Sequence, residues 1–180
     1  MSLSQHFVLM ADYNRWMNTK VYEATSLLNV AALHAGRGAF FGSVFGTLNH
    51  LLVADTIWLQ RFSAHPARFA ALAPIGALPS PRSLSEPLHA DLAALWAARQ
   101  RMDGVIVALS AGAGESDYAQ PLAYTNRAGQ TFVRQFGPLM QHFFNHQTHH
   151  RGQATTLLSQ TGVDVGVTDL LALIPDSAMP

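Results

Sequence analysis

"HFFNHQTHHRGQ", residues 142–153, holds four of the nine histidines of a 180-residue chain. Apolar residues recur around these histidines at steps of three and four, which predicts an amphipathic helix over residues 137–161. With about 100° per residue and His146 set at 0°, the apolar side chains of this helix fall at roughly 20–120°, namely Leu139, Phe143, Ala154, Leu157 and Leu158. His150 lies inside this arc and His146 at its edge, whereas His142 and His149 lie outside it. We therefore expect His146 and His150 to face the protein interior.

The same periodicity predicts further helices along the chain. The five expected helical segments are residues 5–33, residues 39–63, a segment from Ser83 or Ser85 to Leu109, residues 137–161, and a short helix begun by Thr168 or Asp169. Ser2 or Ser4 could cap the first helix, and "HAGRG" (34–38) ends it because two glycines in three residues favour a turn.

Two connections interrupt the helical pattern. Residues 63–83 contain four prolines and predict a long irregular segment, of the kind that often serves as a functional or lid-like loop. "LAYTNRAGQTFV" (122–133) predicts two short strands that form a hairpin around "NRAG". The expected fold class is all-α: an antiparallel four-helix bundle with a long crossover loop and a small β-hairpin before the last long helix. Residues 1–180 are expected to form a single domain.

The composition excludes several classes of protein. Formal net charge is zero, so no basic excess attracts nucleic acid, and no apolar run is long enough to span a membrane. The first ten residues lack the basic start and apolar run of a signal segment, so we expect a cytoplasmic location. Charged residues make up only 12% of the chain, about half the usual share, which suggests extensive burial in a core or against another subunit. Because cysteine is absent, any metal must be held by His, Asp or Glu.

The i, i+4 spacing of His146 and His150 would allow both imidazoles to bind one ion. Two histidines leave a divalent metal under-coordinated, and sites in helical bundles draw ligands from facing helices. Among the other histidines only His50 lies well inside a predicted helix with apolar neighbours, so it is the expected third ligand. A single histidine on an apolar helix is more often a hydrogen-bonded core residue, and that alternative stays open for His50.

Three segments carry a resemblance to a known family. They are "LMADYNRWMN" (9–18), "LNHLLVADTIWLQRF" (48–62) and "HFFNHQTHHRGQATTLLSQTGVDVGVTDL" (142–170). Together they resemble the DinB branch of the DinB/YfiT-like family of bacterial four-helix-bundle metalloproteins, over nearly the whole chain.

The resemblance implies a divalent metal ion, commonly nickel or zinc, held by His50, His146 and His150. It also implies a homodimer, which would suit the low charged fraction. The family name refers to damage induction of a founding member and implies no contact with DNA. Families that look like distant relatives include transferases and isomerases that use low-molecular-weight thiols such as bacillithiol or mycothiol.

Three functions are compatible with such a site. The first is a metal-dependent enzyme with thiol-S-transferase chemistry, in which the metal lowers the pKa of a bound thiol that attacks a small-molecule electrophile. The second is metal-dependent hydrolysis, with Asp55 or Glu23 as the nearest candidates for a base. The third is a metal-binding stress protein without catalysis.

Four further polar residues have two interpretations each. Asn14 and Asn18 share one helix face and could line a pocket beside the metal, although helix packing is the simpler interpretation. Gln153 could orient a ligand or face solvent. Arg151 could pair with a carboxylate or stabilise an interface, although a position at the surface is the expected one.

Overall fold

A computed structural model describes residues 1–176, which are mostly helical with one small antiparallel sheet. The four long helices are α1 (Leu3–Thr25), α3 (Val44–Phe62), α5 (Leu92–Gly112) and α7 (Phe136–Ser159). The shorter elements are α2 (Val30–His34), η1 (Ala70–Leu72), α4 (Ala73–Gly76), α6 (Glu115–Tyr118), β1 (Pro121–Thr125), β2 (Thr131–Gln135) and η2 (Leu170–Leu173).

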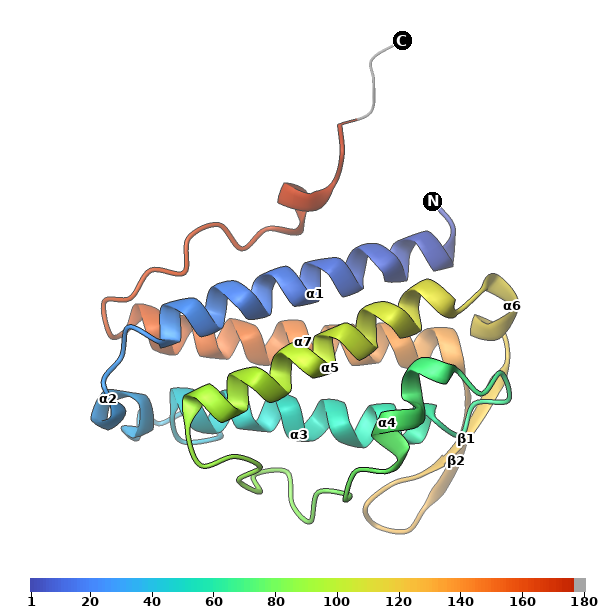
Figure 1. Cartoon of the computed structure of the whole chain (residues 1–180), viewed down its shortest axis with the longest axis horizontal. Helices are drawn as coiled ribbons and strands as arrows, with labels where there is room; N and C mark the ends of the chain where they lie inside the picture. Colours follow the sequence, from blue (N-terminus) through green and yellow to red (C-terminus); the bar gives the residue numbers. More distant parts are fainter. Residues whose placement is uncertain (177–180) are drawn as a thin grey trace.

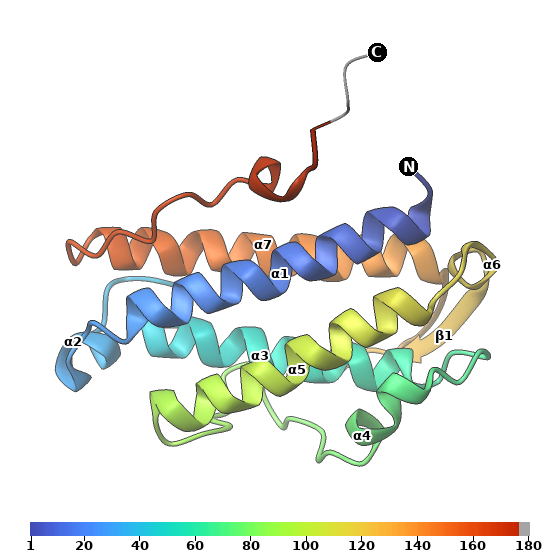
Figure 2. The same cartoon turned by 45° about the horizontal axis from the view of Figure 1, so that its top comes forward.

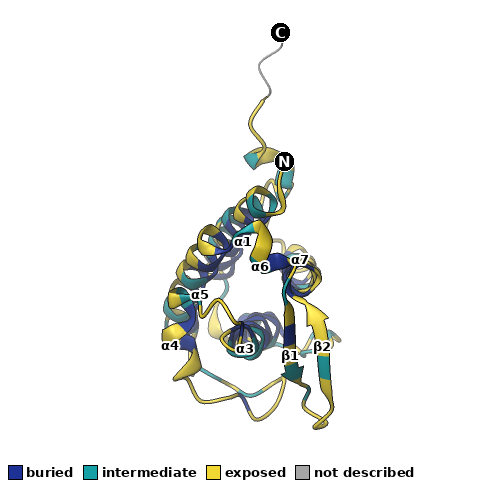
Figure 3. Ribbon diagram, turned by 90° about the vertical axis from the view of Figure 1, so that its right-hand side faces the viewer, coloured by how far each residue is buried: buried dark blue, intermediate teal, exposed yellow. Residues whose placement is uncertain are grey.

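The long helices lie side by side along the longest axis of the molecule (Figures 1 and 2). Helix α1 packs against α5 and α7, and α3 packs against α7 and α5. Helices α1 and α7 run in one direction and α3 and α5 in the other (Figure 1). The successive helices α3 and α5 can run the same way because the connection between them returns along the length of the molecule. The buried residues of the long helices face one another (Figure 3).

The core is apolar and continuous between the long helices. Val21 of α1, Leu59 of α3, Leu95 of α5 and Leu158 of α7 are all fully buried. Burying side chains of this size contributes about 1.5–3 kcal/mol each, so this packing supplies the main driving force for the fold. No helix of residues 1–176 is long and apolar enough to cross a membrane.

The first predicted helix, residues 5–33, is in fact two helices. It begins earlier than expected, with Ser2 as the N-cap in a reciprocal capping box with Gln5. Helix α1 ends at Thr25, and α2 starts after Asn29, whose side chain accepts a hydrogen bond from the Ala32 amide. The prediction of one continuous helix is wrong because this cap stabilises a new start within the apolar pattern.

The second helix starts five residues later than predicted, at Val44 instead of residue 39. Ser43 caps it through the Gly46 amide, and the preceding residues form a tight turn in which Gly42 has a φ of +79°. Glycine favours this left-handed conformation, which would strain another residue. The turn places Phe41 beside the helix, where it contacts His50.

The third helix begins at Leu92, not at Ser83 or Ser85, and its N-cap is Asp91. Pro87 disfavours helical backbone at the residue before it. Residues 77–90 instead run as an irregular connection that Asn49 anchors: its amide donates to the Glu86 carbonyl, and its Oδ1 accepts from the Leu88 amide. The start of this helix was therefore predicted too early.

The predicted hairpin is confirmed, with Pro121 paired to Gln135 and Thr125 to Thr131. The last long helix is also confirmed to within two residues at each end. After it the chain turns back beside α1 (Figure 2), where the Tyr13 hydroxyl donates to the Thr168 carbonyl at 2.7 Å. The short helix expected there is the 3-10 helix η2, preceded by Asp169.

Candidate metal centre

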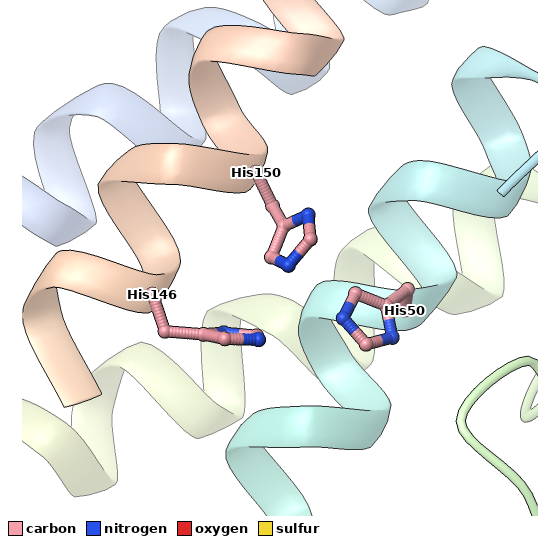
Figure 4. Close-up of side chains that lie close together, drawn as sticks. All are labelled: His50, His146 and His150. Atoms are coloured by element: carbon pink, nitrogen blue, oxygen red, sulfur yellow. The ribbon is translucent and has the colours of Figure 1, made fainter. Parts of the chain in front are cut away.

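Three histidines from two helices converge in the interior. His50 comes from α3, and His146 and His150 come from α7 on successive turns (Figure 4). The centroids of the His50 and His146 rings lie 5.4 Å apart, those of His50 and His150 4.5 Å, and those of His146 and His150 4.4 Å. Each ring offers a nitrogen within 4.8 Å of the other two. The structure thus brings together the three residues selected from the sequence.

The directions estimated for the α7 histidines agree with the structure. His150 is buried, His146 is half-buried, and His142 and His149 are exposed. The assignment follows from helix geometry: at about 100° per residue, His150 is turned from His146 toward the apolar face, whereas His142 and His149 are turned away from it.

Hydrogen bonds orient two of the three rings. His50 Nδ1 lies 2.8 Å from the Leu84 carbonyl oxygen, which can only accept, so Nδ1 carries the proton. His150 Nδ1 donates in the same way to Gln153 Oε1 at 2.7 Å. Both rings therefore keep Nε2 as a free lone pair, the arrangement that protein partners of metal-binding histidines usually enforce. Gln153 thus orients His150, and the Leu84 carbonyl of the crossover segment orients His50.

The histidines are kept neutral by their surroundings. Phe41 stacks on His50 with ring centroids 3.6 Å apart and covers one side of the cluster. Burial lowers the pKa of His50 to about 4, against the opposing bond to Leu84. Burial, together with the neighbouring His150 and His50, lowers the pKa of His146 to about 3. The pKa of His150 is also lowered, chiefly by burial. Neutral imidazoles are the form that binds metal ions.

The donor set suits a divalent transition metal. Nitrogens that share a tetrahedral ion at about 2.0–2.1 Å would lie about 3.4 Å from one another, so small ring rotations would close the present separation. Three neutral nitrogens with no thiolate or carboxylate are compatible with zinc, nickel, copper and iron alike. Three protein ligands leave at least one coordination position for another molecule, as in catalytic metal sites.

A cavity of about 400 Å³ opens beside the cluster. Its lining combines the three histidines with aromatic, aliphatic and cationic side chains: Phe40, Phe41, Ala54, Ile57, Trp58, Arg61, Leu84, Arg127, His149 and Gln153 complete it. This volume lies within the range of small-molecule sites. The α3 residues of the lining share one face of that helix. Phe41, Leu84 and Arg127 come from segments between the long helices, and nothing in the spacing of the sequence indicated that these segments lie beside the histidines.

Comparison with known proteins agrees with the resemblance seen in the sequence. The DinB family matches residues 1–177. The chain belongs to the DinB family. It is also 24% identical to Protein DinB of Bacillus subtilis (strain 168) over 163 residues, which cover 88% of this chain and 87% of that protein. No solved structure matches the chain.

The two helices that carry the histidines also contribute to a buried ion-pair network in this DinB-family protein. Arg99 of α5 is 1% exposed and pairs with Asp55 of α3 and, at 2.9 Å, with Asp103 of α5. Gln147 of α7 donates to the same Asp55 oxygen that Arg99 contacts. Burial raises the pKa of Asp55, and the charge of Arg99 opposes that shift. Asp55 therefore holds helices together and is not a free base beside the metal site.

Helix α1 completes the network. Asn14 and Asn18 both donate to Asp103 Oδ1, at 3.1 and 2.9 Å, which supports the helix-packing interpretation of these residues. Arg151 is 3% exposed and donates to Asn14 Oδ1, so the expectation that it lies at the surface is wrong. The burial of Arg151 depends on its hydrogen-bond partner Asn14, which lies on α1. The sequence around Arg151 gives no sign of this partner, so its burial could not be predicted from the helical period.

Most histidines outside the cluster have separate environments. His65 is buried with Nε2 at 3.2 Å from the Asp117 carbonyl, and the Ala67 amide donates to its Nδ1. His6 lies 3.2 Å from Gln141, and His89 lines a different cavity between α3, α4 and α5. Glu23, the second candidate for a base, is exposed in the last turn of α1 and does not line the histidine cavity.

Proposed function

We propose that this protein binds one divalent metal ion through His50, His146 and His150 in an antiparallel four-helix bundle and uses it for thiol-S-transfer. The observation that carries this proposal is the convergence of three neutral imidazoles, with nitrogens within 4.8 Å, beside a cavity of about 400 Å³. Nickel or zinc is the ion that the family resemblance implies, and imidazole ligands suit both.

The surroundings favour a thiol over an activated water. A divalent ion held by His50, His146 and His150 would lower the pKa of a thiol bound to it. The thiol sulfur would form a bond to an electrophilic carbon as the leaving group departs with its electron pair, and the thiol proton would go to solvent. Within the described chain no Asp or Glu lines the cavity, and a thiolate needs no protein base. The chain has no cysteine, so the thiol must come from a cosubstrate.

The hydrolytic alternative lacks its base. Asp55 is bound by Arg99 and Gln147, and Glu23 lies exposed at the end of α1. Neither carboxylate lines the cavity beside the histidines, so neither can take a proton from a water bound there. Non-catalytic metal binding is the outcome that remains if the metallated protein turns over no substrate.

The first test is elemental analysis of protein purified without added metal or a histidine tag. The wild type is expected to carry about one ion per chain, His146→Ala almost none, and His142→Ala the wild-type amount. His142 is the matched control because it lies one turn earlier on α7 and is exposed. Equal metal content in both variants would overturn the proposed ligand set.

The second test addresses the chemistry. Cobalt-loaded protein is titrated with small thiols, and a thiolate-to-cobalt charge-transfer band is expected in the wild type but not in His50→Ala. A panel of electrophiles then measures transfer. A cobalt-loaded protein that shows no such band with any thiol would refute the thiol mechanism while leaving metal binding intact.

We also propose that residues 1–180 form a single domain, that the protein is a homodimer, and that it binds no nucleic acid. The family match over residues 1–177 supports the first, the 12% charged fraction supports the second, and the zero net charge supports the third. Light scattering coupled to gel filtration tests the dimer, and titration of labelled duplex DNA at low salt tests the last.

A further inference from the structure

Two arginines line the same cavity as the histidines. Arg61 lies in the last turn of α3, and Arg127 lies in the turn between β1 and β2. Throughout residues 1–176, no carboxylate lies within ion-pair distance of either guanidinium. A cavity that gathers two cationic groups without a protein counter-charge requires an explanation.

Both guanidiniums are positioned by neutral groups. Arg127 donates to the carbonyls of Pro81, at 3.0 Å, and of Arg82, which fixes it to the crossover segment. Arg61 lies over the rings of Trp58 and Tyr124, with its Cζ 4.6 and 5.1 Å from their centroids. These contacts leave N–H donors of both side chains free to bind an anion.

The rest of the lining adds no charge to offset them. In the part of the chain that the structure describes, no acidic residue lines the cavity, so no protein carboxylate balances the two guanidiniums there. Partial burial lowers the pKa of Arg61; Tyr124 opposes this shift and the charge of Arg127 reinforces it. A bound anion would relieve this repulsion between the two cations.

The part of the cavity between the arginines and the histidines is apolar. Ala54, Ile57 and Trp58 form the α3 wall, one face of the helix between His50 and Arg61. Phe40 stands at the edge of the cavity and is 86% exposed, unusual for a phenylalanine of a soluble domain. An aromatic or aliphatic ligand segment would cover these side chains.

We propose that the cavity binds an elongated molecule with an apolar body and a terminal carboxylate, which Arg61 and Arg127 bind while the opposite end meets the histidine cluster. The inference rests on the proposed function, because it describes the molecule that function uses. His50 and Arg61 are eleven residues apart on α3, or about 16 Å along the helix. The Arg61 side chain leans back over Trp58, which shortens the span, so several bonds must separate the thiol or electrophile from the carboxylate.

The test compares 6-mercaptohexanoate with 6-mercaptohexanol, which share an alkyl thiol and differ in the charged end. Calorimetry on the metal-loaded protein should show about tenfold tighter binding of the carboxylate by the wild type. Arg61→Gln and Arg127→Gln should each reduce this preference to about twofold or less, with little change for the alcohol. Arg101→Gln is the matched control: Arg101 is exposed on α5, does not line this cavity, and its loss should leave the preference unchanged.

The readouts separate this inference from the proposed function. The cobalt–thiolate band reports the metal chemistry. The ratio of the affinities for 6-mercaptohexanoate and 6-mercaptohexanol reports recognition by the arginines. Calorimetry measures this ratio whether or not the band forms. A wild-type ratio below about two, or one that both arginine variants retain, overturns the inference even if the band forms. Thermal unfolding of each variant verifies that it is folded.

Discussion

The low pKa values of the cluster histidines predict that metal binding survives mild acid. An ordinary histidine, with a pKa of 6.5, is about 97% protonated at pH 5.0, and proton competition would then weaken metal binding about 30-fold per ligand. Two such ligands would weaken it roughly 1000-fold. With the pKa of His50 at about 4 and that of His146 at about 3, both rings stay almost fully neutral at pH 5.0.

The expected loss is therefore small. If solvent screening halves the pKa shifts of His50 and His146, proton competition at these two ligands would reduce the metal affinity only about fourfold between pH 7.5 and pH 5.0. His150, whose pKa is also lowered, adds less than the 30-fold of an ordinary histidine. We expect zinc affinity, measured by calorimetry in a non-coordinating buffer, to fall by less than about 100-fold. A fall of 1000-fold or more would show that these rings titrate normally and that burial does not keep them neutral.

The same shifts determine how the metal-free protein responds to pH. Because the folded-state pKa of His50 and His146 lies below the value of 6.5, the unfolded chain binds protons that the folded chain does not. The free energy of unfolding should thus decrease as the pH falls through 6.5, and these groups should add no further loss below about 3. Urea unfolding at several pH values measures this, and bound zinc should reduce the effect.

Three further predictions concern the supporting structure. Arg99→Met leaves Asp55 and Asp103 buried without their cation and should lower the free energy of unfolding by about 3–5 kcal/mol. Arg101→Met, at an exposed position of the same helix, should change it by less than about 0.5 kcal/mol. Equal losses for the two variants in urea unfolding would contradict a stabilising role of the network. Gln153→Leu removes the hydrogen-bond acceptor of His150 and should weaken zinc binding about tenfold, as measured by calorimetry. Gln160→Leu is the control variant, and an unchanged zinc affinity of Gln153→Leu would rule out an orienting role. Gly129→Ala forces a side chain into a turn with φ of +80° and should lower the melting temperature by several degrees with metal content intact; no shift would show that the hairpin does not contribute to stability.

The site and the network behind it share the same helical turns. Gln147 and Arg151 each follow a histidine of the cluster by one residue, so α7 directs its imidazoles to the cavity and these two polar side chains to partners on α3 and α1. Asp55 does the same on α3, five residues after His50. A rotation of either helix would disturb both sets, and we expect variants of the network to alter metal affinity as well as stability.

The sequence by itself determined the features that depend on local spacing. The helical period identified the long helices, the "NRAG" turn identified the hairpin, and the i, i+4 pair with His50 identified the three histidines. Only the tertiary structure decided which groups from distant segments complete the site: the Leu84 carbonyl on His50, Phe41 over its ring, and Arg127 at the cavity. It also showed that Arg151 is buried. The physical reason is that periodicity encodes which face of one helix is apolar, whereas a buried polar group is stabilised by partners that only the packing of separate segments brings within hydrogen-bond distance.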